Sequence, residues 1–242
     1  MLILFDIDGT LLRSERAGIS AMTSAMAELH SGLQVNWEAV PVSGRLDHLI
    51  WNDLVRLHGL PAGAAEEARF RSVYAAHLER RLREHPTAHS LPGVSHLVEH
   101  LASHPDYTTG VLTGNWQVTG TMKIRAAGLQ PEHFKVAAWA EDGASRRHLP
   151  PVAMARLQAV RGQPVDPRQV VIIGDTPQDV DCALHNGCLC IGVGTGHYEP
   201  SVLQEAGAHL ALPSLAETDG ILEWLERARA GGAVGGAARD VR

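Results

Sequence analysis

From residue 91 onward, short apolar runs alternate with segments of helical periodicity. The pattern predicts strands at residues 107–112, 134–139, 170–173 and 189–193, and helices at 94–103, 118–127, 152–160 and 179–185. Strands that alternate with helices are joined by right-handed crossovers and form a parallel sheet. Residues 2–5 are another continuous apolar run, typical of a strand buried on both faces. The sequence therefore predicts an α/β fold with a Rossmann-like parallel sheet.

Residues 14–90 interrupt this alternation. Amphipathic helices are predicted at 17–30, 47–58 and 64–83, with no comparable strand-like run between them. We therefore expect an α/β core built from residues 1–13 and 91–228, with residues 14–90 as a helical insert. The remaining residues, 229–242, are rich in glycine and alanine and are expected to form a disordered tail.

The charge and hydropathy of the sequence argue against nucleic acid and membrane as partners. The net charge is −6 and no window is strongly basic, which argues against a nucleic-acid-binding surface. No apolar stretch has the length of a membrane span, and the first apolar run meets Asp6 without a basic segment before it. An odd number of cysteines (182, 188 and 190) is expected in a reducing compartment, as buried thiols rather than zinc ligands. We expect a cytoplasmic protein without a membrane partner, either a monomer or a homodimer.

Polar residues follow three of the predicted strands: the pair Asp6 and Asp8, the pair Thr113 and Asn115, and Asp175. Open parallel sheets bind ligands beyond the carboxyl ends of their strands. An aspartate can attack phosphorus, and a second carboxylate two residues later can transfer the protons. Gly9 would let the backbone turn and present N–H groups to a phosphate. Asp-x-Asp in isolation is typical of two solvated carboxylates in a turn, but its place after a buried strand favours a site.

Three segments resemble motifs of the haloacid dehalogenase superfamily. Residues 5–12 (Phe-Asp-Ile-Asp-Gly-Thr-Leu-Leu) resemble its first motif, residues 111–115 its second, and residues 171–180 its fourth. The resemblance extends over roughly residues 1–200. It implies an enzyme, a Mg²⁺-dependent phosphatase that hydrolyses a small phosphorylated metabolite through an aspartyl-phosphate intermediate. The insert would then be a helical cap, as in phosphoglycolate-phosphatase-like members.

The resemblance also implies roles for individual residues. Asp6 would be the nucleophile and a metal ligand, and Asp8 the general acid and base, with its backbone carbonyl on the metal. Asp175 would be the second metal carboxylate. The transferring phosphoryl group would be bound by the Thr113 side chain and by backbone N–H groups at Gly114 and Asn115.

Some assignments remain open on the sequence alone. The third motif usually carries a lysine, and here Arg146 or Arg147 stands in its place, with Arg146 favoured by its distance from the Leu149-Pro150 pair. Asp179 follows Thr176-Pro177 at a position that suits either helix capping or an outer-shell metal role.

Two further residue groups have more than one interpretation. Residues 43–47 resemble a cap loop of phosphoglycolate-phosphatase-like members, which implies that Arg45 contacts an anionic substrate. The alternative is simply an arginine before a helix capped by Asp47. His96 and His100 have the spacing of zinc ligands, although a solvated helix face is favoured.

Four other reactions or roles compete with the phosphatase. A dehalogenase has no need of Asp8. A phosphosugar mutase would need a histidine that residues 13–18 lack, and a phosphonate hydrolase a cap lysine that residues 14–91 lack. A non-catalytic protein that binds a phosphorylated ligand stays open because the third motif is irregular. The identity of the phosphomonoester also stays open.

Overall fold

A parallel sheet of six strands forms the centre of the computed structural model, which describes residues 1–232. The strand order is β5-β4-β1-β6-β7-β8, and every neighbouring pair is parallel. The strands are β1 (Leu2–Phe5), β4 (Thr108–Leu112), β5 (Val136–Ala138), β6 (Val170–Gly174), β7 (Leu189–Val193) and β8 (Leu210–Leu212). The predicted α/β Rossmann-like core is confirmed.

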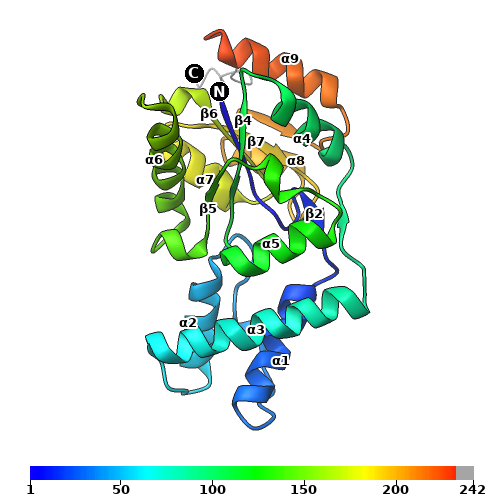
Figure 1. Cartoon of the computed structure of the whole chain (residues 1–242), viewed down its shortest axis with the longest axis vertical. Coiled ribbons are helices and arrows are strands. Elements are labelled where there is room, and N and C mark those ends of the chain that lie inside the picture. The colour runs from blue at the N-terminus through cyan, green and yellow to red at the C-terminus, as the bar shows by residue number, and fades with distance from the viewer. Residues whose placement is uncertain (233–242) are drawn as a thin grey trace.

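Helices cover both faces of the sheet (Figure 1). In β1, Leu2 and Leu4 join one hydrophobic cluster, while Ile3 and Phe5 join the other. The first cluster includes side chains of α6 (Leu149–Arg161), α7 (Pro177–His185) and α8 (Pro200–Glu205). The second includes side chains of α4 (Val94–Ser103), α5 (Gln117–Ala126) and α9 (Thr218–Arg229). Burial on both faces is why β1 and β6 are almost continuously apolar rather than alternating.

Three helices, which we call the cap, lie together at one end of the molecule, away from α9 (Figure 1). They are α1 (Ala17–Leu29), α2 (Asp47–Leu57) and α3 (Ala64–Glu84). In α3, Phe70, Tyr74 and Leu78 are buried at a spacing of four residues, which places them on one helical face. The chain leaves the core through β2 (Leu12–Arg13) and returns through β3 (His89–Ser90), and these two short strands pair antiparallel.

The structure differs from the sequence-based expectation in a few elements. Helix α6 begins at Leu149 rather than 152, because Pro150 and Pro151 fall in its first turn, where proline costs no helical hydrogen bond. Strands β2, β3 and β8 were not predicted, since segments of two or three residues carry no readable periodicity. Helices α8 and α9 were also missed, although α9 buries Ile221, Trp224 and Leu225 at helical spacing. The predicted tail begins at the last residue of α9, and residues 233–242 of it lie outside the described residues.

Several smaller expectations can be compared directly with the structure. All three cysteines are buried free thiols. His96 and His100 are exposed on α4, in agreement with a solvated helix face. Across residues 1–232, we find no helix with the length and apolar character needed to cross a membrane.

Candidate active site

The polar residues that follow β1, β4 and β6 meet at one edge of the sheet. The three strands are neighbours, and Phe5 pairs in register with Val111 on one side and Ile173 on the other. The residues that follow these strands line a pocket of about 490 Å³ between the sheet edge and the cap. Asp6, Asp8, Thr113, Gly114, Asn115 and Asp175 all border it, together with Gly9, Arg45 and Arg146.

Three buried carboxylates form a cluster at the floor of this pocket. Oxygen atoms of Asp6, Asp175 and Asp179 all lie within 4.8 Å of one another. Burial raises the pKa of Asp6 to about 6, and the Asp179 carboxylate adds to the rise, against Arg146 and a Thr113 hydrogen bond. Burial raises the pKa of Asp175 to about 8, with further contributions from Asp179 and Asp6. The cluster therefore combines oxygen donors with an excess of negative charge, which fits the ligand preference of Mg²⁺.

Two glycines make room for Asp175. A Cβ atom at Gly196 would lie 1.7 Å from Asp175 Oδ2, and one at Gly9 would lie 2.4 Å from the same oxygen. Gly9 also has a φ of +81°, which a side chain would strain. Gly9 was predicted to contact the substrate, and the structure gives it this second function of admitting the Asp175 carboxylate.

Asp179 is held by protein donors at both carboxylate oxygens. Its Oδ2 accepts from the Thr176 backbone N–H at 3.1 Å and from the Thr176 hydroxyl at 2.6 Å, and the two residues form a capping box at the start of α7. Its Oδ1 accepts from Arg146 Nη2 at 2.5 Å. The capping interpretation is therefore confirmed, and the same side chain also orients an arginine beside the acidic cluster.

The structure separates the two arginines that the sequence left open. Arg146 is 7% exposed, and its Nη2 lies 3.1 Å from Asp6 Oδ2. Arg147 is half exposed and forms a bidentate pair with Asp181, away from the pocket. Both begin the 3-10 turn η4 (Arg146–His148), which points neighbouring side chains in different directions. Arg146 is thus the arginine that contacts Asp6.

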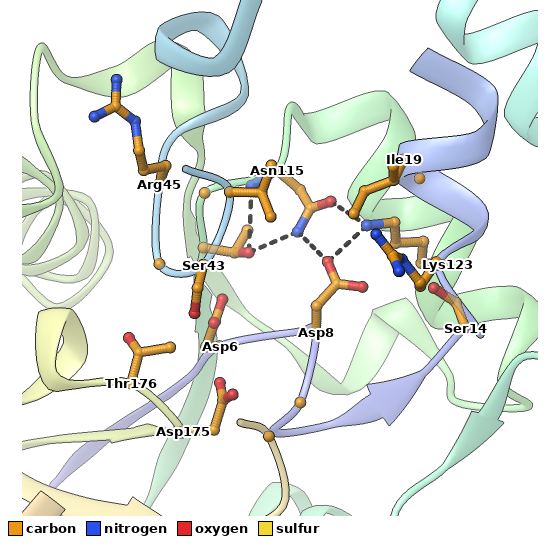
Figure 2. Close-up of a pocket in the computed structure, with 18 of the residues that line it drawn as sticks. Asp6, Asp8, Ser14, Ile19, Ser43, Arg45, Asn115, Lys123, Asp175 and Thr176 are labelled. Atoms are coloured by element: carbon orange, nitrogen blue, oxygen red, sulfur yellow. Dashed lines mark hydrogen bonds and ion pairs between the residues drawn. The ribbon is translucent and has the colours of Figure 1, made fainter. Parts of the chain in front are cut away.

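The Asp8 carboxylate faces away from the acidic cluster, as Figure 2 shows. Its Oδ2 accepts from Asn115 Nδ2 at 2.9 Å and from Lys123 Nζ at 2.6 Å. Asn115 Nδ2 also donates to the Thr113 hydroxyl at 3.0 Å. Sequence reasoning did not include Lys123. The sequence does place Lys123 four positions after Thr119, so the two residues share one face of α5, and Thr119 is buried. A lysine on a buried helical face could have been recognised as a candidate.

The Arg45 side chain has an ion-pair partner inside the cap. Its guanidinium forms an ion pair with Asp53, and Figure 2 shows it directed away from Asp6. A substrate contact by Arg45 stays a prediction, and that contact would have to compete with Asp53.

The backbone of residues 43–46, which we call the cap loop, packs against the loop after β4. A Cβ atom at Gly114 would lie 2.0 Å from the Arg45 carbonyl oxygen. Asp47 N–H donates to the Gly114 carbonyl at 2.7 Å, and Asp47 Oδ2 accepts from Trp116 N–H at 3.0 Å. The expectation that Asp47 caps its own helix is wrong: α2 begins at Asp47, its N-cap is Leu46, and the carboxylate bonds across to the core instead.

Burial of this contact makes stability depend on pH. Burial raises the pKa of Asp47 to about 7, against opposing effects of Lys123 and the Trp116 N–H. Between about pH 4 and pH 7 the folded protein then binds more protons than the unfolded chain, so the free energy of unfolding falls as the pH rises. Asp47→Asn should remove this contribution. Over that pH range, the free energy of unfolding of the variant should then fall by up to about 4 kcal/mol less than that of the wild type. Urea unfolding of both proteins in EDTA at pH 5, 6, 7 and 8 measures it, and parallel pH curves would contradict the assignment.

Comparison with known proteins decides the family. The family model described as haloacid dehalogenase-like hydrolase matches residues 3–184. The chain belongs to this family. Among curated proteins, the tyrosine-protein kinase PtkA of Mycobacterium tuberculosis is 28% identical over 201 residues. That alignment covers 81% of this chain and 62% of PtkA, so the chain spans less than two thirds of the relative's length.

Solved structures share the fold of this haloacid dehalogenase-like chain at low sequence identity. A predicted phosphoglycolate phosphatase from Haemophilus somnus is 18% identical, with a TM-score of 0.67 over 91% of this chain and 97% of that one. A β-phosphoglucomutase from Clostridium difficile is 15% identical, with a TM-score of 0.71 over 95% of this chain and 98% of that one. At these identities the likeness establishes the common fold but not the substrate. The substrate has to be inferred from the residues that line the pocket.

Proposed function

We propose that this haloacid dehalogenase-like hydrolase is a Mg²⁺-dependent phosphatase for a small phosphomonoester. The observation that carries the proposal is the position of Asp6. Its buried carboxylate contacts the Arg146 guanidinium at 3.1 Å and belongs to a cluster with Asp175 and Asp179 at the floor of the pocket. A carboxylate in that position can serve both as a nucleophile and as a metal ligand.

The residues divide the reaction into two displacements. An Asp6 oxygen attacks phosphorus, the bond to the leaving oxygen breaks, and Asp8 gives that oxygen a proton. Asp8 then takes a proton from water, the water oxygen attacks phosphorus, and the Asp6 carboxylate is released with inorganic phosphate. Thr113 and the N–H groups of Gly114 and Asn115 would bind the phosphoryl oxygens.

A metal site would be formed by Asp6, Asp175 and the Asp8 backbone carbonyl. A bound Mg²⁺ would supply the positive charge that allows an anionic carboxylate to approach an anionic phosphate. Both oxygens of Asp179 are engaged by Thr176 and Arg146, which supports a role in orienting Arg146 rather than direct ligation.

The pocket supports a small organic group on the phosphate. Its volume of about 490 Å³ is within the usual range for small-molecule sites. Ile19, Met22 and Ile50 of the cap line it opposite the polar floor. Arg45, predicted as a contact for an anionic substrate, is paired with Asp53, while Arg13 and Arg16 also line the pocket.

The competing functions differ in what they predict. A phosphosugar mutase reaction is disfavoured because residues 13–18 contain no histidine. The name of PtkA suggests phosphoryl chemistry on tyrosine, so O-phosphotyrosine belongs among the substrates tested. A non-catalytic protein would bind phosphorylated ligands and release no phosphate.

The test is phosphate release from a panel of monoesters, with Mg²⁺ and with EDTA. The panel contains 4-nitrophenyl phosphate, O-phosphotyrosine, 2-phosphoglycolate, sugar phosphates and nucleotides. We expect release that requires Mg²⁺, and Mg²⁺ should also raise the melting temperature of the wild-type protein but not of Asp175→Asn, because a ligand that binds the folded state stabilises it. Folded protein that melts higher with Mg²⁺ but hydrolyses nothing would favour the non-catalytic alternative.

A further inference from the structure

Lys123 is a buried cation that the proposed reaction does not yet use. It is one of two lysines in the chain and is 5% exposed. Its Nζ lies 2.6 Å from Asp8 Oδ2 and 2.7 Å from Asn115 Oδ1 (Figure 2). A buried ammonium group is costly unless it is paired and hydrogen-bonded, so this arrangement is specific.

The contacts of Lys123 and Asn115 fix one half of the Asp8 carboxylate. Asn115 accepts from Lys123 through Oδ1 and therefore presents Nδ2 to Asp8 Oδ2, at 2.9 Å. Two donors thus converge on Oδ2. The Asp8 side chain is 44% exposed, and it borders the pocket, so its other oxygen can exchange a proton with a bound ligand.

Helices α1 and α3 of the cap cover the Lys123 ammonium group. A Cβ atom at Gly18 of α1 would lie 3.2 Å from Lys123 Nζ and 3.3 Å from the Tyr74 hydroxyl. The absence of a side chain at Gly18 lets α1 approach the ammonium group closely. Tyr74 itself is 1% exposed, so little water reaches Lys123 from the cap side.

The two buried cations of the pocket serve different carboxylates. Arg146 contacts Asp6 and Asp179 at the end where phosphorus would be attacked. Lys123 contacts Asp8 and reaches neither of them with an ion pair or a hydrogen bond within the described residues.

We propose that Lys123 is a positioning residue for Asp8, holding its carboxylate so that the free oxygen meets the leaving-group oxygen of the substrate. This inference rests on the proposed phosphatase function, in which Asp8 transfers protons. Lys123 does not touch the phosphoryl group, so its effect is specific to the proton-transfer half of the reaction.

Leaving-group dependence tests the inference. An alkyl phosphate expels a strongly basic oxygen that must be protonated, whereas 4-nitrophenolate leaves without a proton. Lys123→Met should lower kcat/KM for an alkyl phosphate from the panel by about 10²-fold, within the usual range for general acid catalysis. The same variant should lower kcat/KM for 4-nitrophenyl phosphate by less than about 10-fold, with KM nearly unchanged.

A double-mutant cycle with Asp8→Asn separates positioning from a general structural role. If Lys123 acts through Asp8, adding Lys123→Met to Asp8→Asn should cause little further loss. Lys123→Gln keeps an amide NH2 group as a donor and should retain more activity than Lys123→Met. Lys135→Met is the matched control, because Lys135 is exposed and, among residues 1–232, its Nζ donates only to the Glu132 carbonyl, at 2.8 Å. Thermal melts of all variants confirm that they are folded.

Each outcome decides the matter. Equal losses for both substrates, or losses that multiply in the double variant, would overturn the positioning role while leaving the phosphatase intact. An active enzyme that is insensitive to Lys123→Met and Lys123→Gln would do the same. A wild-type protein that is inactive on the whole panel would overturn the proposed function and this inference with it.

Discussion

Asp6→Asn is expected to abolish phosphatase activity, with kcat reduced at least about 10³-fold, because an amide cannot form the acyl phosphate. The substitution should not unfold the protein. Burial raises the pKa of Asp6 to about 6, so at pH 8 the variant loses a carboxylate whose charge is unfavourably buried, while Arg146 keeps its contact with Asp179. The free energy of unfolding at pH 8 in EDTA should therefore be no lower than in the wild type.

Steady-state kinetics and urea unfolding of the same preparations check this result. Asp181→Asn is the matched control, since Asp181 is half exposed and pairs with Arg147 outside the pocket. The control should keep wild-type kcat. Activity of Asp6→Asn within tenfold of the wild type would contradict a nucleophilic role.

Arg146→Met is expected to damage both stability and activity. The guanidinium is buried between Asp6 and Asp179, and its removal leaves two buried carboxylates without their cation. Losing one partner of a buried ion pair costs about 3–5 kcal/mol. We expect a loss of that order in EDTA at pH 8, together with a fall in kcat at saturating Mg²⁺.

Two further variants make the arginine result specific. Arg147→Met removes the neighbouring arginine, which is exposed, and should leave both stability and kcat near wild-type values. Arg146→Lys keeps a positive charge but not the planar fork, and should retain more activity than Arg146→Met. Equal effects of Arg146→Met and Arg147→Met on kcat would contradict the assignment of Arg146 to the site.

Much of the fold could be predicted from the sequence because the strands of the core are buried on both faces. Continuous apolar runs indicated the positions of β1 and β6, and alternation with helices indicated that of β4. The rule that parallel strands end at one edge then placed Asp6, Thr113 and Asp175 near each other. The helices of the cap followed from ordinary amphipathic periodicity.

The rest of the site depends on contacts between distant parts of the chain. Arg146 and Arg147 are adjacent in sequence, and only the direction of the η4 turn decides which one is buried. Lys123 has its partner at Asp8, which is 115 positions away along the chain. Asp47 sits where a helix cap is expected, yet its carboxylate bonds to Trp116 in the core. Periodicity describes neighbours within one element and carries no information about these pairs.

The short β2–β3 ladder joins the two chain segments that connect the cap to the core. Leu12 pairs with Ser90 and Arg13 with His89, so the outgoing and returning chains are fastened side by side. A sideways translation of the cap would break these backbone pairs, whereas a hinge rotation about the ladder would leave them intact. The same rotation would lift α1 from Lys123 and the cap loop from Gly114, so a cap that opened in this way would admit substrate and water to the ammonium group together.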